Sequence, residues 1–199
     1  MKNILLVLLL LIQFSTYAQN KKLKDNFSEQ VREEEGDLNK DGRADRVVVM
    51  MDTSDATVPL RLQIFFAQPN KKFRLVVSST RLIEPQYPAH KKGKHNGYQI
   101  PDFSIEKGIL IMRSEVRDGH AEHHFKLRNG NFELIFVSIF NYNGKNTTMV
   151  KNFNLITGER YEKSQLLGSD KFLIKNKFNT MIRPLPKLQN FKPFEKEFY

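Results

Sequence analysis

A short stretch of oxygen-bearing side chains early in the chain has the spacing of a cation-binding loop. Asp37, Asn39 and Asp41 stand at alternate positions, Gly42 follows them, and Asp45 comes four residues after Asp41. A hard cation such as calcium takes six to eight oxygen ligands at about 2.3–2.6 Å, so a short loop must curl sharply to supply them. Gly42 permits that turn because a residue without Cβ tolerates positive φ. The spacing indicates a calcium loop.

The turn would also bring the backbone carbonyl of Arg43 inward, and Asp45 would close the ligand shell. An EF-hand requires a glutamate at its twelfth position, and that position is Val48 here, so the loop is not an EF-hand. The alternative is a polar turn without an ion, since Asp, Asn and Gly are ordinary turn formers. Residues 46–51 are mostly apolar and follow at once, which predicts that the loop leads into a buried strand.

The pattern Asp-x-Asn-x-Asp-Gly-x-x-Asp, followed by a run of valines, resembles the calcium loop of FG-GAP and VCBS-type repeats. These repeats occur in integrin-like propellers and in many secreted bacterial proteins. The downstream order is similar to a group of uncharacterised exported bacterial proteins with one such loop before a β-rich domain. The matching stretches are the Asn-Gly hairpin at residues 128–132 and the Thr-Gly turn at residues 154–159. The resemblance implies one structural calcium ion, with ligands at Asp37, Asn39, Asp41 and Asp45 and at the carbonyl of Arg43. A single loop without a repeat period excludes a propeller formed by this chain alone.

The first residues have the composition of a secretory signal peptide. Lys2 precedes an unbroken apolar run at residues 4–12, and a small-residue cleavage site ends at Ala18. A stretch of about 20 apolar residues is needed to span a bilayer, so this run is too short. We therefore expect residues 1–18 to be removed and the mature chain, without a transmembrane segment, to be periplasmic or extracellular. The chain has no cysteine, so an exported form must be stabilised by its core and by any bound ion.

The chain carries a formal net charge of +10, which favours an anionic partner. Export makes nucleic acid an improbable partner, so we expect anionic envelope glycans or a surface protein instead. The alternative is that the lysines only keep an extracellular β protein soluble. Residues 84–101 form a long irregular segment, which is uncommon in a domain unless it is functional or disordered. Its basic part, from His90 to Tyr98, is a candidate polyanion contact, and a solvated loop is the alternative.

Most of the chain consists of short runs rich in β-branched and aromatic residues, separated by turn signals. Asp118-Gly119 and Asn129-Gly130 are strong hairpin signals. Residues 132–140 are apolar on both faces, so we expect them at the centre of a sheet. The expected strands are residues 46–51, 60–67, 73–79, 104–106, 109–117, 120–128, 132–140, 147–155, 159–163 and 171–175. This order predicts a mainly β fold, an antiparallel meander curled or packed as a sandwich or partial barrel.

Two segments flank the single β domain expected at residues 36–180. Residues 19–35 are a charged leader, in which Leu23, Phe27 and Val31 have the spacing of one helix face. The same residues fit a loose leader that ends in one strand. Residues 181–199 are rich in Pro, Phe and Lys and are expected to form an extended C-terminal arm draped over the domain.

Three residues of the expected strand 120–128 are the nearest approach to a transition-metal cluster. His120, Glu122 and His124 would project from one face, with His123 on the other, at a strand edge or in the core. Two histidines and a carboxylate suit zinc. However, the three positions span about 13 Å, so adjacent pairs could chelate an ion and all three could not. The alternative is a polar face exposed to solvent.

Catalytic motifs are absent from the sequence. It has no nucleophile elbow and no Gly-rich phosphate loop. Glu115, Asp118 and Glu122 are candidate carboxylates for glycoside cleavage, with no motif behind them. We therefore expect a non-catalytic exported β domain with one structural calcium loop and a binding or adhesion role at the bacterial envelope. The alternative is a hydrolase that acts on envelope polysaccharide or peptide.

Overall fold

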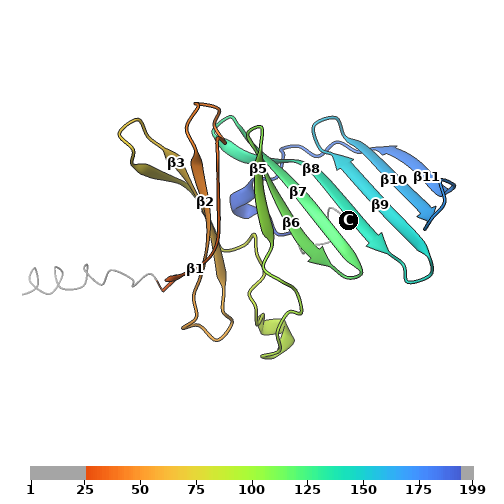
Figure 1. Cartoon of the computed structure of the whole chain (residues 1–199), viewed down its shortest axis with the longest axis horizontal. Coiled ribbons are helices and arrows are strands. Elements are labelled where there is room, and N and C mark those ends of the chain that lie inside the picture. The colour runs from red at the N-terminus through yellow and green to blue at the C-terminus, as the bar shows by residue number, and fades with distance from the viewer. Residues whose placement is uncertain (1–25, 194–199) are drawn as a thin grey trace, which may run out of the picture.

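The computed structural model describes residues 26–193 and contains two open antiparallel sheets (Figure 1). The four-stranded sheet runs in chain order through β1 (Glu29–Gly36), β2 (Asp45–Met51), β3 (Leu60–Ala67) and β4 (Phe73–Ser79). The seven-stranded sheet also runs in chain order, through β5 (Asp102–Glu106), β6 (Ile109–Val116), β7 (Gly119–Arg128), β8 (Asn131–Tyr142), β9 (Thr147–Asn154), β10 (Glu159–Leu166) and β11 (Phe172–Asn179). Two 3-10 helices, η1 (Ala89–Lys91) and η2 (Leu188–Asn190), lie outside the sheets. The prediction of a mainly β antiparallel meander is confirmed.

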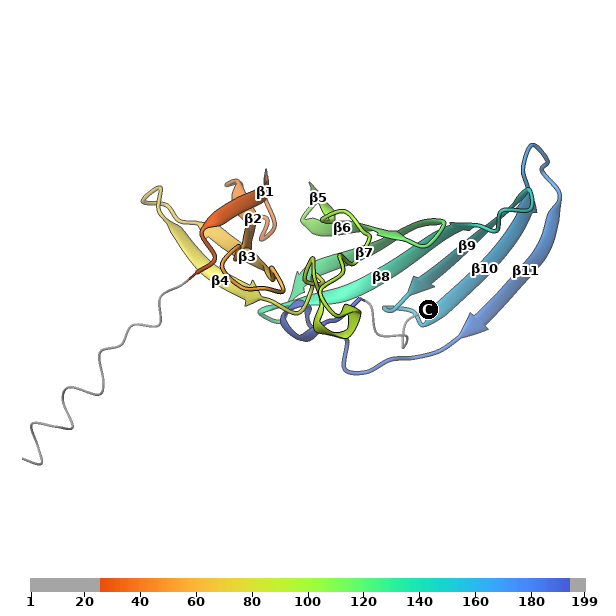
Figure 2. The same ribbon diagram turned by 90° about the horizontal axis from the view of Figure 1, so that it is seen from below.

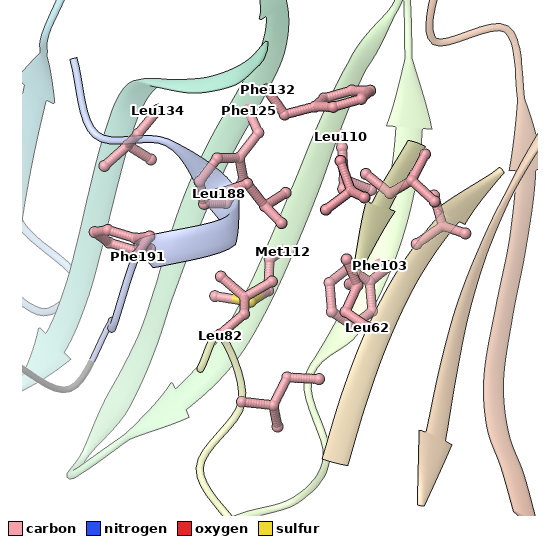
Figure 3. Packing of buried hydrophobic residues seen from close by; sticks show 14 of the residues in the cluster. Leu62, Leu82, Phe103, Leu110, Met112, Phe125, Phe132, Leu134, Leu188 and Phe191 are labelled. Atoms are coloured by element: carbon pink, nitrogen blue, oxygen red, sulfur yellow. The ribbon is translucent and has the colours of Figure 1, made fainter. Parts of the chain in front are cut away.

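The core lies between the two sheets, which pack in the manner of a sandwich. Along β3, buried and half-buried residues alternate, so that Leu60 and Leu62 face inward. Leu110, Met112 and Phe125 of the seven-stranded sheet belong to the same cluster (Figure 3). This period-2 alternation is what an antiparallel sheet shows when one face covers a core and the other faces water.

The edge strands β1 and β5 of the two sheets lie close together (Figure 2). Gly36 of β1 sits directly against Ile105 of β5, and a Cβ on Gly36 would lie only 2.7 Å from the Ile105 Cγ2 atom. Arg32 Nε approaches Asp102 Oδ1 to 3.4 Å on the same side. The sandwich is therefore held together along this side by side-chain contact, while its opposite end spreads open.

The prediction that residues 132–140 form a central strand is confirmed. They belong to β8, which is the fourth of seven strands and pairs with β7 and β9. On one face Phe132, Leu134 and Val137 are buried in the core. On the other face, two half-buried phenylalanines contact histidine rings of β7. The inner apolar residues of β8 are thus buried in the core, and the outer phenylalanines are shielded in part by the histidine rings of the neighbouring strand.

After β11 the chain turns back and enters the core. Leu188 and Phe191 are buried there among residues of both sheets (Figure 3). The backbone N–H of Leu134 donates to the carbonyl of Pro186 at 2.8 Å, so the returning segment bonds to the central strand. The arm predicted from residues 181–199 therefore lies on the domain, as far as Pro193, with its buried side chains in the core and others, such as Met181, exposed. Residues 194–199 lie outside the described residues.

At the other end, the structure decides between a helix and a strand. Residues 29–36 form β1, which pairs with β2 in an antiparallel register that places Glu34 opposite Val47. The helix predicted from the spacing of Leu23, Phe27 and Val31 is therefore wrong where the structure describes it, and the strand alternative is correct. Leu23 and the expected signal peptide, residues 1–18, lie outside the described residues. Between residues 26 and 193, no helix is both long enough and apolar enough to cross a membrane.

Candidate functional site

The candidate calcium loop connects β1 to β2, and its own side chains curl it into a compact turn. The Asp37 carboxylate accepts hydrogen bonds from the backbone N–H groups of Asp41 (3.0 Å) and Gly42 (2.9 Å). Asn39 Oδ1 accepts from the N–H of Asp41, and Asp41 Oδ1 accepts from the N–H of Arg43, both at 3.0 Å. Gly42 has a φ of +83°, as expected for the sharp turn. Three of the predicted ligands therefore lie on one tight turn.

Asp45 lies at the foot of the loop and is fully buried. Its Oδ2 atom accepts hydrogen bonds from the N–H groups of Leu38 (2.9 Å) and Asn39 (3.3 Å). Its Oδ1 atom accepts from the N–H of Ala67 (3.0 Å), at the end of β3. Burial raises the pKa of Asp45, and the hydrogen bonds from Ala67, Leu38 and Asn39 oppose that rise. Asp45 thereby joins the loop to the end of β3, a role that the spacing alone did not predict.

Asp41 is the most engaged of the exposed ligands. The Arg43 guanidinium contacts its Oδ2 atom, and Asn39 Nδ2 donates to the same oxygen at 3.0 Å. Partial desolvation opposes ionisation, but the N–H of Arg43, the Asn39 amide and the Arg43 charge together hold the pKa of Asp41 below its usual value. A cation at this loop would therefore meet an ionised carboxylate that is shared with Arg43.

The donor chemistry of the loop fits a hard cation in part. A carboxylate or amide oxygen that accepts one N–H keeps a lone pair for a metal, which holds for the oxygens of Asp37 and for Asn39 Oδ1. Asp45 is less available, because three backbone N–H groups already surround its carboxylate. No group of three Asp, Glu, His or Cys side chains within residues 26–193 could hold a metal by itself. An ion here would therefore need Asn39 and backbone oxygen atoms as well.

The histidine row of β7 lies as the alternation predicted. His120, Glu122 and His124 are half-buried on the outer face, and both histidine rings contact phenylalanines of β8 at about 5 Å between ring centroids. Glu122 accepts from Arg113 Nη1 at 3.2 Å and lies 3.6 Å from His124 Nε2. Burial and the charge of Arg113 lower the pKa of His120, and Glu122 opposes that effect. The three residues form an aromatic and polar surface, and they are not a metal-binding group among the described residues.

His123 points to the opposite face and is fully buried. Its ring lies 5.3 Å from that of Phe191, in the segment that returns from β11. Burial, with a further contribution from His124, lowers the pKa of His123 to about 4. The core alternative predicted for His123 is confirmed.

The three candidate catalytic carboxylates have separate partners. Glu115 accepts from the N–H of Gln99 at 3.2 Å, and Asp118 lies 3.6 Å from Arg117 in the β6–β7 hairpin. Glu122 pairs with Arg113, as described above. The interactions that these carboxylates make are those of surface and turn residues.

The long segment 84–101 forms one side of a cavity, and the sequence predicted only this side. The cavity has a volume of about 590 Å³. It is lined by Glu84, His90, Lys91, Tyr98, Val116, Arg117, Ile139, Asn141, Lys151 and Pro193. The sequence indicated the segment as a place for partner contact, but not the residues of β8 and β9 that complete the cavity, because these are far away in the chain.

The lining of the cavity combines cationic side chains with the apolar residues Val116, Ile139 and Pro193. Lys91 Nζ donates to the carbonyl of Asn96 at 2.6 Å and lies 5.8 Å from the centre of the Tyr98 ring. Lys151 lies 3.6 Å from Glu162, and Arg117 is exposed at the rim. The arrangement suits a ligand with an anionic group and an apolar or ring-shaped body.

Comparison of the chain with protein-family models, with curated proteins and with solved structures finds no match.

Proposed function

We propose that the chain is a non-catalytic exported β domain in which the loop from Asp37 to Asp45 binds one calcium ion as a structural clamp. The observation that carries the proposal is the tight turn of Asp37, Asn39 and Asp41, fastened to the end of β3 through the buried Asp45. An ion in this turn would take the lone pairs that the backbone N–H groups leave free on Asp37 and Asn39, and it would compete with Arg43 for Asp41. It would thereby stiffen the connection between β1 and β2.

The size of the stabilisation follows from mass action. Extracellular calcium modules bind with a dissociation constant of about 10⁻⁴ M. Free calcium at about 1 mM would then stabilise the fold by about 1.4 kcal/mol. For a chain of this length, that corresponds to a rise of about 3–6 °C in Tm.

Thermal melting of the purified protein in EDTA and in millimolar calcium tests the clamp. We expect Tm to rise with calcium in the natural chain and to stay constant in Asp41→Ala. Asp55→Ala is the matched control, because Asp55 also caps an exposed turn, through hydrogen bonds to the N–H and hydroxyl of Thr57. The proposal would be contradicted if calcium did not raise the Tm of the natural chain, or if it raised the Tm of Asp41→Ala by the same amount.

The binding role is assigned to the cavity beside segment 84–101. Lys91, Arg117 and Lys151 outnumber Glu84 among the lining residues, and an anionic ligand would compete with Asp118 for Arg117 and with Glu162 for Lys151. Tyr98 offers a ring for stacking. Anionic glycans of the bacterial envelope would complement this lining, because their carboxylate or sulfate groups can pair with the cations and their sugar faces can stack on the ring. Attraction between exposed charges weakens with salt, so binding should weaken as ionic strength rises.

Retention on a heparin matrix at low and high salt tests this role. The double variant Lys91→Gln/Arg117→Gln should elute at lower salt than the natural chain. The control Lys71→Gln/Lys72→Gln removes the same charge from the exposed β3–β4 turn and should elute close to the natural chain. Equal losses in both variants would mean that only net charge matters, and the cavity would lose its assignment.

A further inference from the structure

The strand β11 is the free edge of the seven-stranded sheet (Figure 1). Within residues 26–193 it pairs only with β10, on one side, and all eight of its residues are exposed. A strand in this position presents a row of N–H and C=O groups that have no partner strand, which is a template for an added strand.

Exposed apolar side chains concentrate on and beside this strand. Of the ten large hydrophobic residues that are exposed between residues 26 and 193, six lie between residues 167 and 181. They are Leu167 (47%), Phe172 (44%), Leu173 (49%), Ile174 (45%), Phe178 (49%) and Met181 (57%). A concentration of exposed apolar side chains is typical of an interaction site in a soluble protein.

The apolar side chains project from both faces of the strand. Ile174 pairs with Ser164 and Phe178 pairs with Arg160, so both lie on the face that continues from the core. Phe172 pairs with Gln165 and lies on the opposite face, where Lys163 Nζ approaches its ring to 4.4 Å. A lipid surface can contact one face of a sheet, whereas an added strand contacts side chains on both faces. The arrangement therefore favours a strand over a membrane.

The positive charge of β11 determines which kind of strand could pair with it. Lys175 and Lys177 lie within β11, and Lys171 precedes it. Antiparallel pairing of β11 with its counterpart in a second copy would bring these lysines together, and like charges on facing positions are destabilising. Lysines on an edge are a known protection against self-association of this type. A second copy of β11 is therefore disfavoured, and an acidic strand is favoured.

Besides β5, which contains Asp102 and Glu106, one other edge strand between residues 26 and 193 is acidic: β1, which contains four glutamates. That strand lies against β5, with Gly36 in contact with Ile105 and Arg32 beside Asp102. Both acidic edges are therefore engaged with each other, and no acidic strand within residues 26–193 is left to pair with β11.

We propose that β11 is a docking strand for an extended acidic segment of a partner protein, which pairs with its free edge as an eighth strand. Backbone hydrogen bonds to the edge supply affinity. The exposed Ile174 and Phe178 on one face and Phe172 on the other receive the apolar side chains of the partner. Lys175 and Lys177 select carboxylates at alternating positions, and the Lys177 ammonium, which lies 2.8 Å from Glu159 Oε1 of β10, would be shared between that carboxylate and one of the partner.

Binding of a synthetic peptide of alternating glutamate and valine, about as long as β11, tests the proposal by fluorescence anisotropy. The double variant Lys175→Glu/Lys177→Glu should weaken binding about tenfold. The control Lys71→Glu/Lys72→Glu makes the same charge change in the β3–β4 turn and should leave binding within about twofold. Both pairs of lysines are exposed, so neither variant should prevent folding.

Two further peptides separate strand addition from simple charge attraction. A peptide in which prolines replace the valines keeps the same charge, but it cannot form the ladder and should not bind. A peptide of alternating lysine and valine should bind the double variant better than the natural chain. Equal binding of the proline peptide, or equal binding to the natural chain and the double variant, would overturn the proposal.

Other occupants would give different results. Sedimentation with phosphatidylglycerol vesicles that depends on Lys175 and Lys177 would identify a lipid surface and overturn the proposal. A dimer in light scattering that is broken by Phe178→Glu would identify a second copy and overturn it as well. Absence of peptide binding at millimolar concentration would also reject it.

Discussion

The two halves of the seven-stranded sheet have the same topology and different surroundings. In β6, β7 and β8, the inner face is covered by the four-stranded sheet and by the returning segment, and Met112, Phe125 and Val137 are buried. In β11 no residue is buried. The connections differ in length, with two residues in each turn from β5 to β8 and four or five from β8 to β11. All of them join neighbouring antiparallel strands, so the difference in burial arises from what packs on the sheet.

This difference shows which forces hold each half. Burial of apolar surface contributes about 25 cal/mol per Å², and it dominates the stability of the covered half. The open half, around β10 and β11, is held by its hydrogen-bond ladder and by cross-strand pairs such as Lys177 Nζ to Glu159 Oε1 (2.8 Å). Such pairs contribute about 0.2–1 kcal/mol each. We therefore expect the open half to be less stable locally and available for a partner.

The largest effect is expected from two phenylalanines of the same sheet. Phe125 is fully buried and Phe172 is 44% exposed. Phe125→Ala removes a buried ring and leaves a cavity, so it should destabilise the protein by about 4 kcal/mol. Phe172→Ala should change stability by about 0.5 kcal/mol or less. Urea unfolding of both variants measures the two values, and similar losses would mean that the two halves do not differ in packing.

The next effect concerns the segment that covers the inner face. Leu188 is fully buried at η2, whereas Leu173 of β11 is 49% exposed. Leu188→Ala should cost about 3 kcal/mol, because the arm contributes to the core. Leu173→Ala, the matched control, should cost about 0.5 kcal/mol or less. If Leu188→Ala lost as little stability as its control, the returning segment would not contribute to the core, and the two halves would not differ in this respect.

The smallest of the three effects is a pH dependence that belongs to the covered half. The pKa of His123 falls from 6.5 to about 4 in the folded protein. At His123, the unfolded chain therefore binds a proton at a higher pH than the folded protein does. The contribution of His123 to the free energy of unfolding is full above pH 6.5 and is lost as the pH decreases toward 4. The loss by about pH 4.5 should be about 2 kcal/mol.

Urea unfolding at several pH values checks this slope. His123→Leu should flatten it between about pH 6.5 and pH 5, where carboxylates remain ionised. His90→Gln is the control, since His90 is exposed, and it should keep the slope of the natural chain. An unchanged slope in His123→Leu would assign the pH dependence to other groups.

Features that depend on neighbours in the chain were predictable. The alternation around His123 placed it opposite His120 and His124, and burial of His123 confirms this. Apolar residues on both faces of β8 predicted a central strand, because only a strand covered on both sides needs them. The strand β1 was ambiguous, since Phe27 and Val31 have a spacing that suits a helix, and pairing with β2 decided the outcome.

The sequence by itself determined the strands, the tight turns and the compact acidic loop, because period-2 alternation and turn residues act between near neighbours in the chain. Only the tertiary structure decided that Asp45 is tied to Ala67, that Leu188 and Phe191 complete the core, and that Lys151 faces the segment 84–101. It also decided that β11 stays uncovered. Each of these depends on contacts between residues far apart in the chain, and the free energy of such contacts is set by which surfaces meet when the two sheets pack.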